Sequence, residues 1–219
     1  MIKAFPSNNI IAEFGNNKLD YNEFLKGISK RKQDFFAFSE QVHGNNVLIV
    51  KQSDLNFNNR YKIYKNVDGL VTKEKNIFLV VKTADCIPIF FFEPENKIIG
   101  VAHAGREGTR LNIVKSVIQK IVELGAQKDS ILVEIGPAIC RKHYKVSQEI
   151  FQQFVLETEI PQKKWKLDLK KIIFSQLIKE GIQKKNIIND KICTFEDKNY
   201  FSYRRDKTKQ RQVSYICLK

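Results

Sequence analysis

The stretch Ile77-Phe-Leu-Val-Val-Lys-Thr-Ala-Asp-Cys-Ile-Pro-Ile-Phe-Phe-Phe92 lies near the middle of a chain of 219 residues. Its two apolar runs, Ile77–Lys82 and Ile87–Phe92, have the length of buried β-strands. The polar break between them contains Asp85 and Cys86, and such breaks are where a rigid sheet presents functional groups. The stretch therefore predicts a fold built on a sheet, with Cys86 as a candidate for chemistry.

Apolar runs bounded by polar turns continue this pattern along the rest of the chain. No internal repeat, low-complexity tract or flexible linker separates them, so we expect one mixed α/β domain that spans residues 1–219. Besides the two runs above, the pattern predicts strands at Val47–Val50, Ile98–His103, Ile131–Ile135 and Val213–Leu218.

Helical periodicity is present in two segments, Arg110–Leu124 and Leu167–Glu180, each of which places its apolar residues on one stripe. Thr109 is the expected N-cap of the first helix, and a glycine follows the end of each segment, where it can stop the helix. Ser147 is the expected cap of a third helix that ends at about Glu157.

The composition is that of a globular chain, with 42% hydrophobic and 28% charged residues. No apolar run approaches the roughly 20 residues that a membrane span needs. The segment Met1–Pro6 lacks the apolar core of a secretory signal. We therefore expect a cytoplasmic protein with no membrane partner, whose four scattered cysteines do not form a disulfide scaffold.

The net charge of +14 is concentrated in the second part of the chain. Residues 141–219 carry 19 Lys and Arg against 9 Asp and Glu, whereas residues 1–140 carry 19 against 15. A solvated basic face and an attraction for anionic molecules are both compatible with this excess. No nucleic-acid-binding motif accompanies it, so we do not expect a nucleic-acid partner.

The chain has three histidines, and two of them stand at the ends of predicted strands. His43 precedes one strand and His103 ends another. Together with Cys86 they form a donor set that suits Zn²⁺, with a fourth position left for water or substrate. Their spacing alone also allows a structural role for each histidine, or a Cys86 thiolate nucleophile with His43 or His103 as its base.

Two other segments have a composition that suits anion binding. Gly105–Thr109 leads into a predicted helix, where free backbone N–H groups can hold an anion; an ordinary tight turn is the alternative. Tyr200–Arg205 combines aromatic rings with two guanidinium groups, which can stack a base and hold a phosphate. A strand with solvent-exposed arginines is the alternative for this second segment.

Six short motifs occur in a fixed order along the chain. They are Gln41–Gly44, Asp68–Thr72, Thr83–Pro88, Val101–Gly105, Ile135–Ile139 and Phe201–Asp206. This ordered set resembles the YfiH/YlmD family, long described as laccase-domain or multicopper polyphenol oxidoreductase proteins. The resemblance covers most of the chain, from about Phe38 to Leu218.

The resemblance implies an α+β fold in which layered mixed β-sheets are flanked by helices, a four-layer arrangement related to that of the cytotoxic necrotising factor deamidases. It also implies a metal centre whose ligands are His43, Cys86 and His103. Three histidines are too few for the several copper ions of a phenol oxidase, so we expect zinc rather than copper. Cys86 and His103 are then catalytic. Asp85, which is next to a ligand, is the first candidate for orienting the ligands or transferring a proton, and Asp68 is the second.

The activity implied by the resemblance is that of a purine nucleoside phosphorylase acting on adenosine, inosine, guanosine and methylthioadenosine, with adenosine deaminase activity. The partners would be a purine nucleoside and phosphate, bound by Arg106, Arg204 or Arg205, in a monomer or homodimer. The alternatives are a laccase-like polyphenol oxidase, and a Cys–His thiol hydrolase or peptidoglycan-editing factor that uses Cys86.

The chain departs from the family pattern at several positions around these residues. Arg106-Glu107 stands where the family usually has Trp-Arg, and Gly136–Cys140 and Tyr144–Val146 also differ. In the N-terminal part, Glu13–Gly15 stands near the position of a Thr-Arg-x-Gly-Gly block. None of these changes affects the three implied ligands, so we expect the centre to be kept and the substrate contacts around it to be altered.

Overall fold

The computed structural model describes residues 2–3, 5, 9–28, 34–55, 60–158 and 161–219, and these residues form two mixed β-sheets of six strands each. In spatial order, the first sheet consists of β1 (Ile2–Lys3), β2 (Ile10–Phe14), β12 (Gln212–Leu218), β7 (Ile77–Thr83), β3 (Phe35–Ser39) and β5 (Tyr61–Tyr64). The second consists of β11 (Ile187–Asn189), β10 (Leu132–Ile135), β8 (Ile87–Glu93), β9 (Ile98–Ala104), β6 (Gly69–Thr72) and β4 (Val47–Ile49).

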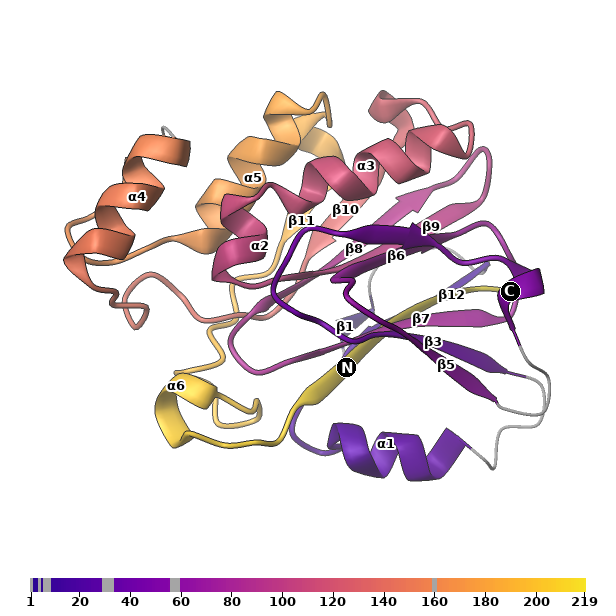
Figure 1. Ribbon diagram of the computed structural model, residues 1–219, viewed down its shortest axis with the longest axis horizontal. Helices are drawn as coiled ribbons and strands as arrows, with labels where there is room; N and C mark the ends of the chain where they lie inside the picture. Colours follow the sequence, from indigo (N-terminus) through magenta and orange to yellow (C-terminus); the bar gives the residue numbers. More distant parts are fainter. Residues whose placement is uncertain (1, 4, 6–8, 29–33, 56–59, 159–160) are drawn as a thin grey trace.

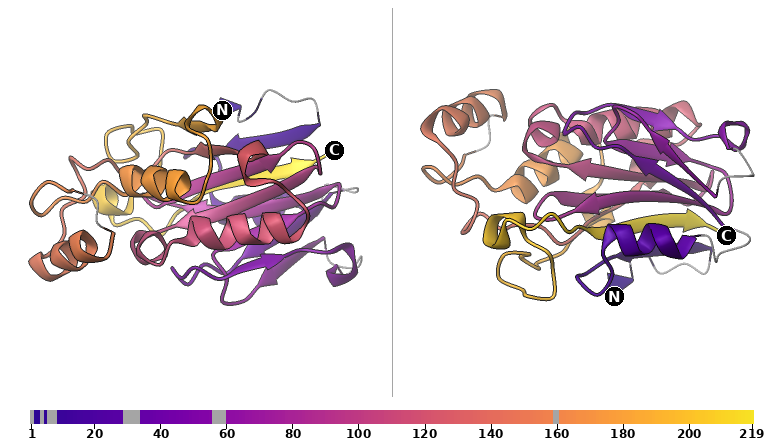
Figure 2. Two further views of the ribbon diagram at one scale, coloured as in Figure 1. Left: turned by 90° about the horizontal axis from the view of Figure 1, so that it is seen from above. Right: turned by 60° about the horizontal axis from the view of Figure 1, so that its bottom comes forward.

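Helices cover the outer face of each sheet (Figures 1 and 2). α1 lies against the first sheet, whereas α2, α3 and α5 lie over the second. Among the described residues, no helix is both long and apolar enough to cross a membrane. The helices are α1 (Tyr21–Ile28), α2 (Arg106–Arg110), α3 (Ile113–Glu123), α4 (Gln148–Thr158), α5 (Leu169–Lys179) and α6 (Tyr203–Asp206), with short 3₁₀ turns at Gln52–Asp54, Lys128–Ser130 and Lys184–Asn186.

Three apolar clusters within the described part of the chain hold these layers together. Between the two sheets, Phe14 stacks on Phe90 with ring centroids 4.3 Å apart. On the outer face of the second sheet, α3 and α5 contribute the fully buried Val117 and Ile172. On the outer face of the first, Phe24 of α1 meets Phe36 edge-on at 5.6 Å. The architecture is therefore helix, sheet, sheet, helices, which confirms the expected layered α+β fold.

All six predicted strands are present, and each differs from its prediction by a single residue at one end. The sequence did not predict the other strands, which are short. β3 has five residues that are buried throughout, and β5 is an edge strand with an exposed alternating pattern. In such short strands, pairing with neighbours from distant parts of the chain decides the conformation, and local periodicity is weak.

Of the two N-caps that the sequence predicts, Ser147 is confirmed. The Ser147 hydroxyl accepts a hydrogen bond from an N–H of α4 at 3.4 Å, and Asp168 caps α5. Thr109 as the cap of Arg110–Leu124 was wrong, because Thr109 lies inside α2 with a buried hydroxyl. The chain breaks after α2, and Asn112, at φ 57°, caps the separate helix α3. Asn112 can serve because its short amide side chain tolerates the left-handed region.

Tyr200–Arg205 forms no strand. The Ser202 hydroxyl accepts a hydrogen bond from the Arg205 N–H at 3.2 Å and so caps the single turn of α6. The strand alternative for this segment was therefore wrong, because a capping serine three residues before the N–H favours a helical turn.

Candidate metal centre

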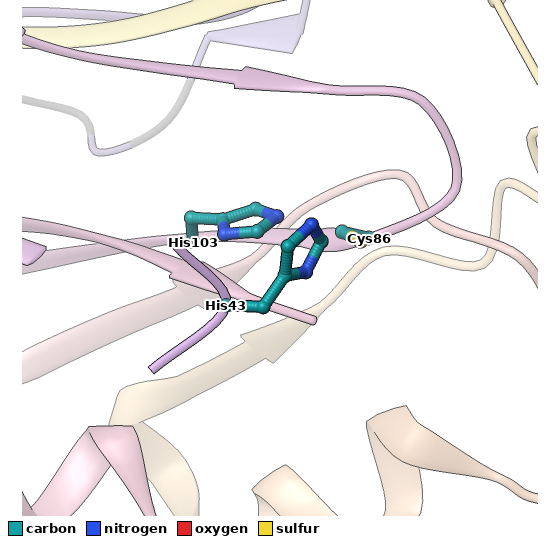
Figure 3. Close-up of side chains that lie close together, drawn as sticks. All are labelled: His43, Cys86 and His103. Carbon is teal, nitrogen blue, oxygen red and sulfur yellow. The ribbon is translucent and has the colours of Figure 1, made fainter. Parts of the chain in front are cut away.

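His43, Cys86 and His103 come from three separate segments and meet at one end of the second sheet (Figure 3). Cys86 directly precedes β8, and the antiparallel pairing of β8 with β9 places Pro88 opposite His103. His43 lies on the connection between β3 and β4. One ligand atom from each of the three residues lies within 4.8 Å of the others, so this set could hold a metal ion.

Asp68, at the start of β6, organises two of these three residues. Its carboxylate is fully buried and accepts hydrogen bonds from the backbone N–H groups of Val42, His43 and Gly44 at 3.2, 3.0 and 2.7 Å. Its Oδ1 also lies 2.8 Å from Nδ1 of His103. Burial opposes ionisation of this carboxyl, but the His103 interaction and the backbone donors outweigh it and lower the pKa of Asp68.

The His103–Asp68 contact determines which ring nitrogen faces the site. A carboxylate accepts a hydrogen bond from Nδ1–H, so Nε2 is the nitrogen left for Cys86 or a metal ion. This is the arrangement by which a carboxylate fixes the orientation of a metal-binding histidine. His103 is 3% exposed, which restricts its ring further.

His43 is held in place from the backbone side. Its φ of 64° lies in the left-handed region, and Asp68 stabilises this conformation by accepting the His43 N–H. Gly105 allows the imidazole to approach, because a Cβ at Gly105 would stand 2.5 Å from Nδ1 of His43. The side-chain amide of Gln41 exchanges two hydrogen bonds, of 2.7 and 2.8 Å, with the backbone of Lys82 on β7. The His43 loop is thus fixed to both sheets.

Cys86 and His103 each stabilise the charged form of the other. Burial opposes ionisation of the Cys86 thiol, but His103 and then His43 outweigh it and lower the pKa of Cys86 to about 6. Burial also opposes protonation of His103, but the Cys86 thiolate and Asp68 raise the pKa of His103 to about 9. A thiolate is the form in which cysteine binds metal and also the form that attacks electrophiles, so this pair serves either chemistry.

The sequence pattern of a family described as multi-copper polyphenol oxidoreductase laccase matches residues 13–219. The chain belongs to this family. It is 37% identical over 192 residues to a purine nucleoside phosphorylase of Campylobacter jejuni, a match that covers 84% of this chain and 77% of the relative. It is 30% identical over 210 residues to the purine nucleoside phosphorylase YlmD of Bacillus subtilis, which covers 90% of this chain and 76% of that protein.

Solved structures agree with this membership. YlmD from Geobacillus stearothermophilus superposes with a TM-score of 0.84 at 25% identity, over 99% of this chain and 94% of that one. The hypothetical protein YfiH of Bacillus licheniformis superposes with a TM-score of 0.83 at 26% identity, over 96% and 93% of the two chains. The resemblance to the YfiH/YlmD family is therefore confirmed.

In this YfiH/YlmD-family chain, a cavity of about 520 Å³ opens onto all three residues of the centre. Lys82, Tyr203 and Arg211 also line it, together with Gln41. Sequence reasoning missed Lys82 and Arg211, whereas Tyr203 belongs to the segment Tyr200–Arg205 that the sequence indicated for base stacking. The signal for Lys82 was a charged residue that ends the apolar run Ile77–Lys82, whereas nothing in the sequence distinguished Arg211 from the surrounding basic residues.

The three arginines expected at the substrate site lie elsewhere around it. Arg106 pairs with Glu107 at 3.0 Å, and Arg204 packs over the Tyr144 ring with 5.0 Å from its guanidinium carbon to the centroid. The Arg205 guanidinium donates to a set of backbone carbonyls and pairs with Asp206. Those carbonyls belong to Thr194, Phe195, Asp197 and Tyr200.

Asp85 and Tyr144 connect the centre to this arginine-bearing segment. The Asp85 carboxylate accepts the Thr194 hydroxyl at 2.7 Å and the backbone N–H of Arg204 at 2.6 Å. It is Asp68, and not Asp85, whose carboxylate contacts His103. Burial and then the charge of Cys86 raise the pKa of Tyr144 to about 12, so the phenol stays neutral beside the site.

Proposed function

We propose that this protein is a zinc-dependent purine nucleoside phosphorylase with adenosine deaminase activity. The observation that carries the proposal is the convergence of His43, Cys86 and His103 on one cavity, with the His103 tautomer set by Asp68. The names of the relatives, which are purine nucleoside phosphorylases at 30–37% identity, give the reaction class.

The donor set fits zinc. Two imidazoles and one thiolate are ligands that a borderline-soft ion accepts, and three protein ligands leave a position open for a reacting group, as in catalytic zinc sites. His43, Cys86 and His103 would hold the ion, which would supply Lewis-acid polarisation at the reacting oxygen. The lowered pKa of Cys86 supports the assignment, because a thiol must lose its proton to bind.

The cavity suits a nucleoside and an anion. Its volume of about 520 Å³ lies within the range of small-molecule sites. The ring of Tyr203 at its wall can stack on a purine. Lys82 and Arg211 line the same cavity, and burial followed by the nearby charge of Arg211 lowers the pKa of Lys82. Two cations this close favour a dianion such as phosphate.

The remaining polar residues position these groups. We assign phosphate binding to Lys82 and Arg211, which line the cavity, whereas Arg106 and Arg204 lie near Tyr144 and are not part of the cavity lining. Arg205 holds α6 through its carbonyl contacts and so places Tyr203. The neutral phenol of Tyr144 lies under the Arg204 guanidinium, and Asp85 keeps Arg204 beside it by accepting its backbone N–H.

The test begins with metal analysis of the purified protein, where stoichiometric zinc is expected and its absence would remove the metal assignment. Inosine with phosphate should then give hypoxanthine and ribose 1-phosphate by product chromatography. Adenosine without phosphate should give inosine. The His103→Ala variant should lose the zinc ion and, with it, the two reactions. Zinc-loaded parent protein that forms neither product would exclude the proposed activity.

A thiol hydrolase is the second candidate, favoured by the Cys86–His103–Asp68 series of contacts. In that function Cys86 is unligated and reacts with carbon. Alkylation by iodoacetamide separates the two functions. A zinc ligand is protected until a chelator is added, whereas a free nucleophile reacts at the same rate with and without the chelator.

A further inference from the structure

A second group of metal-ligating side chains lies outside the centre described above. Sγ of Cys140, Sγ of Cys193 and a carboxylate oxygen of Glu196 all lie within 4.8 Å of one another. His143 adjoins this group, because its Nε2 lies 2.8 Å from Oε1 of Glu196. Two thiols and a carboxylate thus lie together, with an imidazole beside the carboxylate, and the proposed reaction uses none of them.

The backbone holds the four side chains in two matching turns. Cys140 and His143 are three residues apart on a turn closed by a 3.0 Å hydrogen bond from the His143 N–H to the Cys140 carbonyl. Cys193 and Glu196 are three residues apart on a turn closed in the same way at 3.1 Å. The two turns are joined, since the Cys140 N–H lies 3.2 Å from Sγ of Cys193. Such paired turns are typical of structural zinc sites, whose ligands come in closely spaced pairs.

Cys140, Cys193 and Glu196 are close enough to share one ion, whereas His143 contacts the group through Glu196 and has to move toward the thiols to share it. Zinc bonds of about 2.0–2.3 Å place tetrahedral ligand atoms about 3.3–3.8 Å apart. The His143–Glu196 contact of 2.8 Å needs to open by only about half an ångström to reach that separation. The His143 ring stacks on Phe195 at 4.2 Å and 11°, which already restricts its orientation.

A neighbouring cation can offset the net charge of the occupied site. Two thiolates and a carboxylate carry three negative charges, so a divalent ion leaves one. The ammonium group of Lys142, 3.2 Å from Oε1 of Glu196, offsets it. Cys140 also lines a cavity of about 580 Å³, which gives a hydrated ion access to its thiol.

We propose that Cys140, His143, Cys193 and Glu196 bind a second ion of the zinc class in a closed structural site. On binding, both thiols release their protons to solvent and the ion replaces the His143–Glu196 hydrogen bond. The site ties the 140–143 turn to the 193–196 turn. The latter supplies the Thr194 hydroxyl to Asp85 and the carbonyl acceptors to Arg205, so the second ion stabilises one wall of the first centre.

The test uses Co²⁺ alone as the probe, in a Cys86→Ser background that removes the thiolate of the first centre. Reduced, metal-free Cys86→Ser protein titrated with Co²⁺ should develop a near-ultraviolet thiolate-to-cobalt charge-transfer band that saturates at one ion per chain. Adding Cys140→Ser should reduce this band by about half or abolish it. The matched control is Cys217→Ser, a buried cysteine in β12 outside both groups, which should leave the band unchanged.

A milder pair of variants keeps the test informative if Cys140→Ser does not fold. His143→Ala and Glu196→Gln retain both thiols, so they should keep the band and weaken Co²⁺ binding by more than about tenfold. The absence of a charge-transfer band in folded, fully reduced Cys86→Ser protein would overturn the proposal. So would a Cys140–Cys193 disulfide in protein purified with reductant, seen as a loss of two mass units. These outcomes do not depend on nucleoside turnover.

Discussion

The centre at His43, Cys86 and His103 and the cluster at Cys140, His143, Cys193 and Glu196 use similar donors in opposite ways. The first takes its ligands from segments far apart in sequence and faces a cavity. The second takes them from two tight turns, where Cys140, Cys193 and Glu196 lie together and His143 contacts Glu196. Three protein donors leave a position for substrate, whereas four close the coordination shell. In the roles proposed above, the first site serves a reaction, and the second, with His143 as its fourth ligand, serves stability.

Removing the Asp68 carboxylate should break the first centre and leave the second unaffected. Asp68→Asn places an amide N–H beside Nδ1 of His103, which favours the wrong tautomer and also loses part of the support for the His43 loop. We expect metal affinity at the first centre to fall by about 10–100-fold. Competition titration with a chromogenic chelator measures this.

The control for this change is Asp129→Asn, an exposed aspartate away from both groups. It should titrate like the parent protein. If Asp68→Asn binds as tightly as the parent, the carboxylate does not orient His103, and the first centre resembles the second in relying on its ligands alone.

Gly105→Ala tests how closely the first centre is packed. The new Cβ would stand 2.5 Å from Nδ1 of His43, so the imidazole has to move. We expect a loss of about 1–3 kcal/mol in the free energy of unfolding, together with weaker metal binding. Thermal unfolding with and without zinc separates the two effects. Gly27→Ala, in α1 with open space around the Cβ, is the matched control and should stabilise the protein slightly.

Lys82 and Arg211, the cations that line the cavity, should affect phosphate binding beside the first centre and leave the second cluster unchanged. Lys82→Met and Arg211→Met should each raise KM for phosphate by about tenfold, which corresponds to about 1.4 kcal/mol of binding. The KM for inosine and the zinc content should change little. Arg110→Met removes a cation of similar size that pairs with Glu107 and Glu157, and it serves as the comparison. Equal KM values for phosphate in all three variants would remove the anion site from this cavity.

Glu134, on β10, should make the free energy of unfolding depend on pH. Burial and then the charge of Asp190 raise the pKa of Glu134 to about 7, and one of its oxygens has no hydrogen-bond partner among the described residues. The folded state therefore keeps a proton that the unfolded chain loses, so stability should fall as the pH rises from about 4.5 to 7 and level off above that. Glu134→Gln should flatten this slope and gain about 1 kcal/mol at pH 8. Urea unfolding across this range measures both, and an unchanged slope in the variant would contradict the prediction.

How far the sequence could predict the molecule differs between the two regions. The long apolar runs fix β7, β8 and β9, because their periodicity and length are unambiguous. The ordered motifs brought His43, Cys86 and His103 together, which spacing alone could not do. The strands β3 and β5 are too short to show a pattern, and their pairing partners lie far away in the chain.

For the second region, the three-residue spacing of the ligands does not stand out in the sequence, because one turn pairs cysteine with histidine and the other pairs cysteine with glutamate. Lys82 and Arg211 were missed for a different reason. A cavity is a property of the assembled sheets, so a charge at the end of the run Ile77–Lys82 does not by itself reveal one, and Arg211 does not differ in local sequence from the other basic residues.

The position of β12 has a consequence for the order in which the protein acquires its structure. Residues 212–218 form the strand that lies between β2 and β7 and pairs with both. While the chain emerges from a ribosome, the first sheet stays divided in two until this strand appears, even though the ligands of the first centre have long been synthesised. Pairings of such large sequence separation form slowly. Removing residues 212–218 should therefore abolish folding of the first sheet as a whole, whereas the loss of an edge strand of similar length would not.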